Sequence, residues 1–449
     1  MPFVAHSYHD IAITRESDVI VDCAYDPTQN LPVNKNITTL SFTSNFDVSN
    51  AVSLTRMFAN NYSLRSIDLS AFDTSAVEDM SEMFYMCGAL RDIKFGPKFN
   101  TSNVKSMAYM FSECELLKEL DLSNFDTHNV KNMAYMFYDC CSLAKLDVSM
   151  FDTSNVEDMM SMFSECSLLT SIDVTHFDTS NVKDMNNMFC KCTRLISVDV
   201  THFNTSKVKD MSEMFSGCYS LTSIDVTHFD TSNVEDMSFM FNYCDKLRSI
   251  DVSNFNTSKV KDMSYMFYAC YSLTSLDLSN FKANSDRVNM SSMFDSCNAL
   301  TEVDLSSFAN TMCKVSSMFG CCNALTRVKF NDSFGTLYAK DMSYMFEECW
   351  SLTTIDLRQF NTSNVVDMRN MFRDCLSLTN IDVSHFDTSN VRDASRMFEG
   401  CEELMNLDIS SFVLLNIETK DMFKGCKHVN TFTFPDDIDF RNSTTRNLT

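Results

Sequence analysis

The segment Met214–Phe239 reads MFSGCYSLTSIDVTHFDTSNVEDMSF and decides the fold, because it is one copy of a unit that recurs along almost the whole chain. Its opening dipeptide Met-Phe returns every 25 to 27 residues. The methionines of this dipeptide are Met57, Met83, Met110, Met136, Met162, Met188, Met214, Met240, Met266, Met293, Met318, Met345, Met371, Met397 and Met422. A fixed period of this length predicts a solenoid in which each copy packs only on its neighbours.

Two spacings alternate within one copy. Ile224 and Val226 are two residues apart, which is the period of a strand, and the following Asp-Thr-Ser-Asn supplies turn-forming side chains. The next apolar residues, Val234, Met237 and Met240, recur at three, the period of one helical face. We therefore predict an α/β solenoid like that of leucine-rich repeats. It should carry one long parallel β-sheet on one face and short helical segments on the other.

The repeat boundaries predict three regions. Residues 1–36 do not fit the unit and are expected to cap the N-terminal end, since exposed solenoid ends need a cover. Residues 37–434 are expected to form about sixteen repeats of 25 to 27 residues. Residues 435–449 are polar and are expected to form a C-terminal cap and tail.

The whole unit resembles the 26-residue repeat of BspA-like leucine-rich-repeat surface proteins. The residues that carry this resemblance are F-D-T-S-N-V-x-D-M-S-x-M-F-x-x-C-x-x-L-x-x-I-D-V, nearly verbatim from Phe151, Phe177, Phe229 and Phe386. It implies a non-enzymatic surface or adhesion protein that recognises host or matrix proteins. The N-terminus shows no signal peptide and no segment suits a membrane span, so an intracellular interaction scaffold is the alternative.

Fourteen of the 19 cysteines occupy one column, four residues after the repeated Met, from Cys87 to Cys426. A cysteine at the same position in all copies but the first, which has Asn61, is typical of a small buried hydrophobic residue, with some oxidised pairs as the alternative. Buried thiols favour a reducing compartment. The Met columns are expected to be core as well.

A column of aspartates marks the middle of the predicted strand. Its members are Asp68, Asp121, Asp147, Asp173, Asp199, Asp225, Asp251, Asp277, Asp304, Asp356, Asp382 and Asp408, and Lys94 and Lys329 replace it in two copies. Like charges on neighbouring strands repel. Hydroxyl groups at plus and minus two, such as Ser223 and Thr227 around Asp225, are expected to donate hydrogen bonds to them.

Three functions of this column remain open: a solvated face that keeps the sheet soluble, an acidic surface for the basic patch of a protein, or a set of cation ligands. Our candidate binding residues are Asp147, Asp173, Asp199, Asp225, Asp251 and Asp277, with His176, His202 and His228 at the rim. The histidines suit a polar strand-end position better than a metal site. We therefore predict no metal and no cofactor.

The net charge of −24 excludes nucleic acid and anionic membrane surfaces as expected partners. No nucleotide-binding, zinc-binding or metalloprotease motif occurs. No copy of the repeat looks chemically unlike its neighbours, whereas an active site needs unlike groups that converge once. We predict a monomeric protein-binding solenoid, and a metal-dependent enzyme is only a remote alternative.

Overall fold

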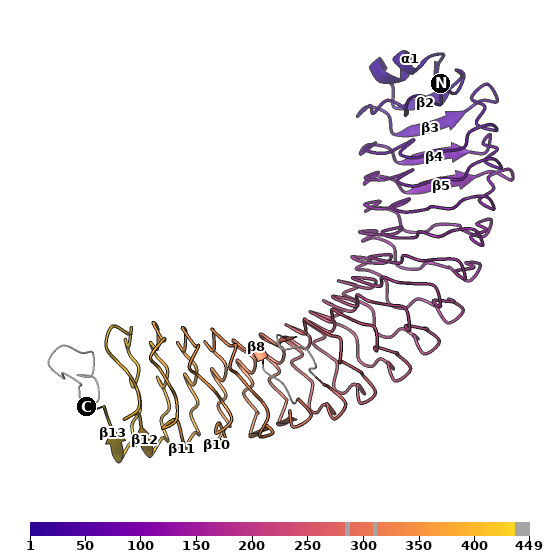
Figure 1. Cartoon of the computed structure of the whole chain (residues 1–449). Helices are drawn as coiled ribbons and strands as arrows, with labels where there is room; N and C mark the ends of the chain where they lie inside the picture. The colour runs from indigo at the N-terminus through magenta and orange to yellow at the C-terminus, as the bar shows by residue number, and fades with distance from the viewer. Residues whose placement is uncertain (283–287, 309–311, 436–449) are drawn as a thin grey trace. The chain divides into compact units, whose positions relative to one another are not determined.

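The computed structural model describes residues 1–282, 288–308 and 312–435. The chain forms two compact units. The N-terminal unit holds residues 1–208 and 214–224, and the C-terminal unit holds residues 209–213 and 225 onward. In each unit the copies of the repeat, here called coils, stack one on the next (Figure 1). The solenoid prediction is confirmed, whereas the predicted tail from 436 onward lies outside the described residues.

The strands of the N-terminal unit form one parallel sheet. The elements of this unit are β1 (Phe3–Ala5), α1 (Tyr8–Ile13), β2 (Asp18–Val21), β3 (Thr39–Phe42), β4 (Ser66–Leu69) and β5 (Asp92–Phe95). The strands follow the order β1-β2-β3-β4-β5, with each strand paired to the same positions of the next coil, such as Ile67 to Ile93. Because β1 and β2 continue this sheet, we propose that residues 1–36 cap the N-terminal end.

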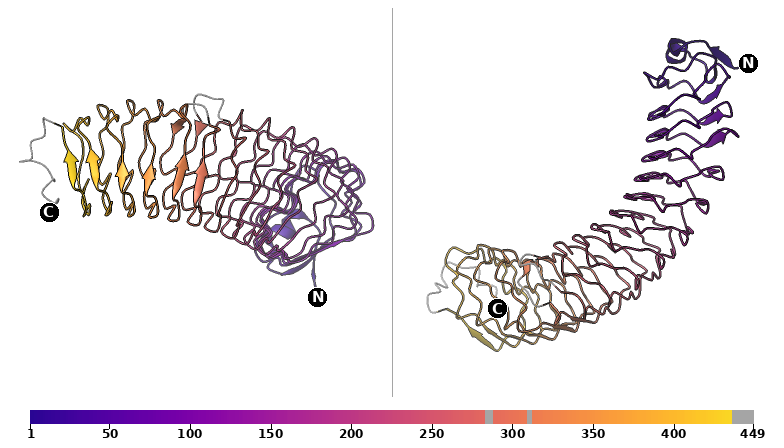
Figure 2. Two further views of the ribbon diagram at one scale, coloured as in Figure 1. Left: turned by 90° about the horizontal axis from the view of Figure 1, so that it is seen from below. Right: turned by 45° about the vertical axis from the view of Figure 1, so that its right-hand side comes forward.

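The described residues of the C-terminal unit form three shorter sheets. Its strands are β6 (Val288–Asn289), β7 (Glu302–Asp304), β8 (Met312–Lys314), β9 (Arg327–Lys329), β10 (Thr354–Ile355), β11 (Asn380–Ile381), β12 (Asn406–Asp408) and β13 (Thr431–Thr433). They pair as β6-β8, β7-β9 and β10-β11-β12-β13, all parallel. The strands β10 to β13 lie side by side in the left view of Figure 2.

The prediction of one long sheet is therefore wrong, although its parallel pairing is right. In the described residues of the N-terminal unit, no strand follows β5. Two of the later coils of that unit keep a single bond at the start of the extended segment. The amide of Ile196 donates to the carbonyl of Thr170 at 3.1 Å, and Thr222 donates to Ile196 at 3.1 Å. We call this face of each coil, equivalent to residues 118–122, the strand side.

The predicted helical segments are also absent, since α1 is the only α-helix in the part of the chain that the structure describes. The equivalent of residues 107–114, here called the turn side, is a succession of tight turns. The amides of Tyr109 and Phe111 donate to the next coil, to Ala134 and Met136. The amide of Met110 instead donates within its own coil, to the carbonyl of Met107.

The spacing of the coils explains why a helix cannot form here. Phe84 and Phe111 stack with ring centroids 5.5 Å apart, and Phe111 and Phe137 are 5.7 Å apart. An α-helix with its side chains is about 10–12 Å wide. Helices in successive coils would therefore overlap, whereas flat turns stack at this spacing.

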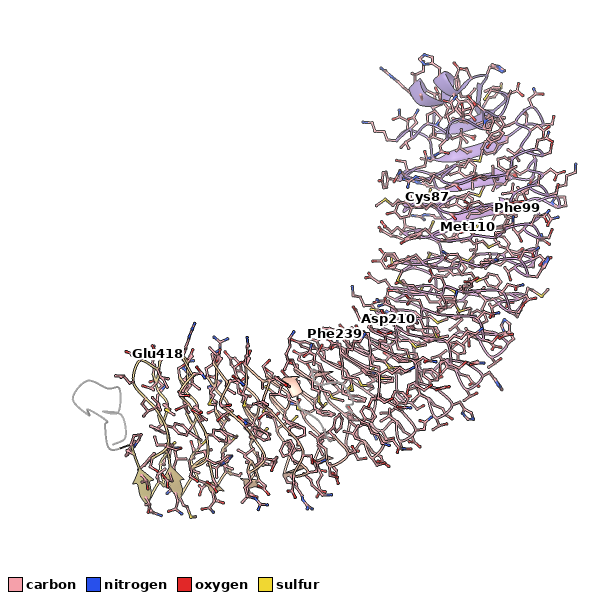
Figure 3. All side chains as sticks on the ribbon, in the orientation of Figure 1. Cys87, Phe99, Met110, Asp210, Phe239 and Glu418 are labelled. Carbon is pink, nitrogen blue, oxygen red and sulfur yellow. The ribbon has the colours of Figure 1, made fainter. Side chains whose placement is uncertain are left out.

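The core prediction is confirmed. Val104, Met107, Met110, Phe111 and Cys114 are all fully buried, and the same columns are buried in nearly every coil. Figure 3 labels three buried side chains of the N-terminal unit, those of Cys87, Phe99 and Met110. The column cysteines that the structure describes are free thiols, as are the other described cysteines, while the side chain of Cys313 lies outside the description.

Thiols of the buried cysteine column also have hydrogen-bonding partners. The thiol of Cys114 donates to the carbonyl of Phe84 at 3.4 Å, and that of Cys140 donates to Phe111 at 3.2 Å. Burial raises the pKa of Cys87 and Cys166 to about 12. Such thiols stay protonated near neutral pH and are unreactive.

A buried row of threonines, not anticipated from the sequence, joins the coils at the Asp-Thr-Ser-Asn turn. The hydroxyl of Thr101, which is fully buried, donates to the carbonyl of Asp126 at 2.8 Å and accepts from the amide of Asp126 at 2.7 Å. Thr179 makes the same two contacts with Asn204, at 3.1 and 2.7 Å. One hydroxyl thus satisfies both backbone groups of a residue in the next coil.

Candidate functional site: the strand-side carboxylates

The six candidate aspartates are exposed on the strand side of their coils. Asp147, Asp173 and Asp199 belong to the N-terminal unit, whereas Asp225 and Asp251, with Asp277, belong to the C-terminal unit. Their neighbours in sequence point inward, since Val148 and Val174 are buried. In these coils the alternation predicted for a strand is therefore present, although none of the six aspartates lies in a strand.

Each carboxylate is held by a hydrogen bond from the residue two positions later. Asp173 accepts from the amide of Thr175 at 3.1 Å and from its hydroxyl at 2.7 Å. Asp225 accepts from the amide of Thr227 at 3.0 Å and from its hydroxyl at 2.6 Å. Asp147, Asp199, Asp251 and Asp277 accept at least the corresponding amide.

These bonds favour the ionised form of four of the six carboxylates. Hydrogen bonds from the following serine or threonine lower the pKa of Asp147, Asp173, Asp225 and Asp251. Repulsion from the neighbouring Asp173 acts in the opposite direction on Asp147, but it is weaker than the hydrogen bonds. The predicted relief of repulsion by hydroxyl donors is thus half right. Thr227 donates to Asp225, whereas the described structure shows no bond from Ser223 to it.

The histidines occupy exposed strand-end positions. The ring Nε2 of His176 lies 2.8 Å from the carbonyl oxygen of Val148 in the preceding coil. His228 contacts the hydroxyl of Thr227 at 3.2 Å, and His202 is exposed. Asn280 fills the same place and also donates to the preceding coil. Among the residues that the structure describes, no group of three or more His, Cys, Asp or Glu side chains suits a metal ion.

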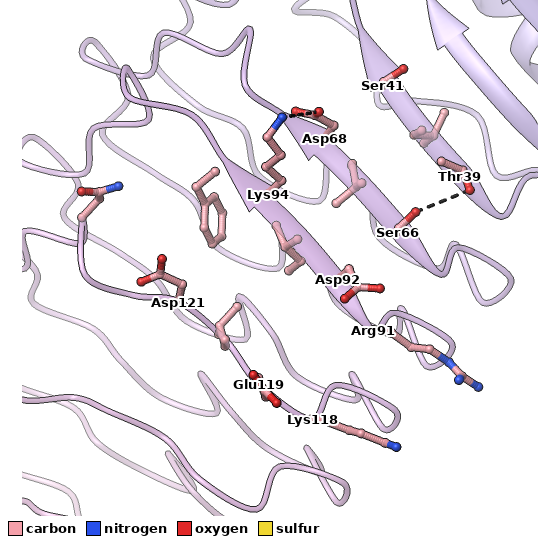
Figure 4. A pocket seen from close by; sticks show the side chains of 16 residues that line it. Thr39, Ser41, Ser66, Asp68, Arg91, Asp92, Lys94, Lys118, Glu119 and Asp121 are labelled. Atoms are coloured by element: carbon pink, nitrogen blue, oxygen red, sulfur yellow. Dashed lines mark hydrogen bonds and ion pairs between the residues drawn. The ribbon is translucent and has the colours of Figure 1, made fainter. Parts of the chain in front are cut away.

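The two lysine coils neutralise acids of the preceding coil. The ammonium of Lys94 lies 2.9 Å from Asp68, and Lys329 lies 2.9 Å from Asp304. A hollow of about 950 Å³ lies beside Lys94, between β5 and residues 118–121 (Figure 4). Its floor includes Leu120, which is partly exposed, unlike Ile67, which is buried. A smaller hollow of about 320 Å³ is lined by residues of β7 and β9.

The turn side differs from coil to coil, contrary to the expectation that no copy is chemically unlike its neighbours. It carries tyrosines at Tyr85, Tyr109, Tyr135 and Tyr138 in the N-terminal unit. In the C-terminal unit it carries an ion-pair network around Arg373, which lies 2.8 Å from Glu347 and 3.0 Å from Asp374. The signal in the sequence is the variable residues beside the constant Met-Phe. Contacts between these residues of successive coils were not predicted, because this segment was expected to be helical.

Asp236 lies between Val234 and Met240, in the segment that was expected to be helical. It instead pairs in a parallel bridge with Asp210 and Asp262, and its carboxylate accepts from the amide of Ser238 at 2.8 Å. Burial, with weaker repulsion from Asp210 and Asp262, raises its pKa. Figure 3 shows Asp210 with Phe239 and Glu418 along one edge of the C-terminal unit.

The repeats match the family model described as DUF285, Mycoplasma protein of unknown function. The matched segments are residues 29–117, 92–170, 141–224, 169–256, 193–308, 220–331 and 313–434. The chain belongs to this family. The expected resemblance to BspA-like proteins is therefore shown at the level of a bacterial repeat family. A search of curated proteins found no match to this DUF285 chain.

The solved structures that this chain matches include bacterial leucine-rich-repeat proteins of low identity. A leucine-rich repeat protein from Bacteroides ovatus is 20% identical, with a TM-score of 0.37, and the match covers 80% of this chain and 82% of that one. A leucine rich cell surface protein from Faecalibacterium prausnitzii is 15% identical, with a TM-score of 0.33 and coverage of 91% and 84%. Within the described residues, no helix is long and apolar enough to cross a membrane.

Proposed function

We propose that this chain is a non-enzymatic protein-binding solenoid whose strand-side carboxylates recognise the basic patch of a protein. The observation that carries the proposal is the row of exposed, hydrogen-bonded aspartates in each unit, such as Asp147 and Asp173. Their lowered pKa values keep them charged at neutral pH. Charge repeated at a regular interval speeds encounter with a cationic surface and favours partners of matching charge.

The fixed orientation of these carboxylates supports binding. The amide of Thr175 and its hydroxyl hold one oxygen of Asp173. The remaining lone pairs can accept bonds from lysine or arginine. Because the carboxylate is already positioned, the aspartate side chain loses less conformational freedom when a partner binds. The same contact occurs at Asp225 in the C-terminal unit.

We place the protein at the cell surface as an adhesion protein, and this location rests on the resemblance of its repeat to the BspA-like unit. An intracellular scaffold that uses the same strand-side residues is the second candidate. The observation that favours it is the column of buried free thiols, including Cys114 and Cys140, since such thiols persist where the medium is reducing. In both cases we propose a monomer that binds protein rather than nucleic acid.

The experiment compares two variants that remove the same charge from different columns of the N-terminal unit. Asp147→Asn with Asp173→Asn removes strand-side charge. Glu78→Gln with Glu157→Gln removes carboxylates that already pair with lysines of the chain, at 2.6 and 2.5 Å. The probe is a fluorescent oligo-lysine peptide, measured by anisotropy at several salt concentrations.

The first variant is expected to bind oligo-lysine about two- to thirtyfold more weakly than the second, since it loses two exposed ion pairs that contribute about 0.2–1 kcal/mol each. Salt should weaken the parent more than the first variant. Equal binding by both variants would refute the strand-side proposal, because net charge alone would then determine the affinity.

A further inference from the structure

Four tyrosines form a ribbon on the turn side of the N-terminal unit. Tyr85 and Tyr109 meet edge to face, with ring centroids 6.1 Å apart. Tyr109 and Tyr135 stack in parallel at 4.4 Å, and Tyr135 meets Tyr138 at 5.5 Å. All four side chains are partly exposed. The ribbon therefore spans three successive coils and presents aromatic surface to solvent.

More carboxylates than cations lie close to this ribbon. Acidic neighbours are Glu82, Glu113, Asp139 and Glu165, and the cations are Arg56 and Lys191. Lys191 pairs with Glu165 at 2.6 Å, and the hydroxyl of Tyr138 donates to Glu165 at 3.5 Å. Burial, with repulsion from Glu165, raises the pKa of Asp139 to about 6. The ribbon thus lies in a region of uncompensated negative charge.

An arginine of the chain shows which ligand this chemistry suits. The guanidinium of Arg56 lies over the ring of Tyr85, 5.9 Å from its centroid, and pairs with Glu82. The C-terminal unit repeats the arrangement, with Arg369 5.5 Å from the ring of Tyr344. Arg369 also pairs with Asp367 at 3.4 Å. In both places a turn-side tyrosine and a carboxylate hold one guanidinium.

The repeat places Tyr109 and Tyr135 in the same column as Arg56, immediately before the repeated Met. Both have positive φ, 58° and 57°, which costs about 1–2 kcal/mol for a residue with a Cβ. Their mutual stacking offsets part of this cost. The column therefore holds large aromatic rings where glycine or asparagine would be less strained.

We propose that the ribbon Tyr85, Tyr109, Tyr135 and Tyr138, with Glu113 and Asp139, is a second binding surface that accepts an arginine-rich segment of a protein partner. Arginine is favoured over lysine because its planar guanidinium stacks on aromatic rings and pairs with a carboxylate through two donors. This surface lies on the turn side and is independent of the strand-side aspartates.

The test uses the full chain and two peptides of equal length, oligo-arginine and oligo-lysine, both labelled for anisotropy. Tyr109→Leu with Tyr135→Leu removes the π surface but keeps apolar bulk. Tyr109→Phe with Tyr135→Phe keeps the rings. The strand-side variant Asp147→Asn with Asp173→Asn is the control, and thermal unfolding confirms that each variant is folded.

The parent should bind oligo-arginine more tightly than oligo-lysine. The leucine variant is expected to bind oligo-arginine about tenfold more weakly, whereas the phenylalanine variant binds like the parent. The strand-side control should keep the preference for arginine even if its affinity for oligo-lysine falls. A leucine variant that keeps the parental preference would overturn the inference and leave the strand-side proposal untouched.

A second variant covers the case in which the leucine variant does not fold. Glu113→Gln with Asp139→Asn leaves every ring in place and removes two carboxylates beside the ribbon. It is expected to reduce the preference for oligo-arginine over oligo-lysine about threefold. The reason is that a guanidinium stacked on the tyrosine rings pairs with these two carboxylates through two donors. An unchanged preference in this variant would equally overturn the inference.

Discussion

The buried threonine row makes the sharpest prediction about stability, and Thr101 is its clearest member. Its hydroxyl satisfies both the amide and the carbonyl of Asp126, at 2.7 and 2.8 Å, and its side chain is fully buried. Thr101→Val keeps the shape of the side chain but removes both hydrogen bonds. Two backbone groups of the next coil then lose their partner.

The expected loss follows from these two groups. Each of these partly buried hydrogen bonds contributes about 0.5–1.5 kcal/mol, so Thr101→Val should destabilise the N-terminal unit by about 1–3 kcal/mol. Thr101→Ser keeps the hydroxyl and loses one methyl group, which is worth about 1 kcal/mol. The order of stability should therefore be parent, serine variant, valine variant.

Thr175→Val is the matched control. Thr175 is exposed, and its hydroxyl bonds only to the carboxylate of Asp173, at 2.7 Å. The same chemical change there should alter stability by no more than about 0.5 kcal/mol. Urea unfolding compares the variants, and hydrogen exchange of the amide of Asp126 reports the local effect.

The amide of Asp126 should exchange faster in Thr101→Val than in Thr101→Ser. The reasoning would be refuted if the valine variant were as stable as the parent or more stable than the serine variant. It would also be refuted if Thr175→Val were equally destabilising, because burial of the hydroxyl would then not matter.

Three further changes test other columns. Cys218→Ser should lower the melting temperature, because a shorter C–O bond holds the donor away from the carbonyl of Phe189, which the thiol reaches at 3.2 Å; an unchanged melting curve would contradict this. Asp225→Asn should be nearly neutral in urea unfolding, because the side-chain oxygen of asparagine still accepts the hydrogen bond from Thr227. Asp225→Ala removes this acceptor and should lose about 1 kcal/mol, and equal losses in the two variants would exclude this role. The raised pKa of Asp139, about 6 against its usual 3.8, means that the folded state binds a proton more tightly. Stability should therefore fall as pH rises from about 4 to about 6, and Asp139→Asn should remove this slope from pH-resolved unfolding; an identical slope in both proteins would disprove the assignment.

The core could be predicted from the sequence because its columns are simple. Val104, Met107, Met110, Phe111 and Cys114 recur as apolar residues, and any closed coil must bury such residues. The turn at Asp-Thr-Ser-Asn was also anticipated, and the amide of Ser102 donates to the side chain of Asn100 at 2.9 Å as expected. The hydroxyl of the buried Thr101 was missed because one copy of the repeat does not show its neighbour.

The turn side could not be predicted from spacing alone. A three- and four-residue period suits one face of a helix, and it suits a chain of tight turns equally well. The distance between coils decides between them, and stacked rings such as Phe84 and Phe111 set that distance at 5.5 Å. A single copy of the repeat carries no information about it.

The candidate site was predicted in part. The exposure of Asp173 and Asp225 and their hydroxyl partners followed from the alternation of the strand side. The tyrosine ribbon did not follow, because Tyr109 and Tyr135 become neighbours only when coils stack through turns. Whether either surface binds a protein remains a proposal.

Carbodiimide cross-linking tests the central claim most directly. The reagent joins a carboxylate to a lysine amine in contact with it, and mass spectrometry of the parent chain with bound oligo-lysine identifies each carboxylate that reacts. Our account predicts that the linked residues are strand-side aspartates, such as Asp147 and Asp173 in the N-terminal unit and Asp225 and Asp251 in the C-terminal unit. Links confined to other carboxylates, such as Glu78 and Glu157, would contradict it.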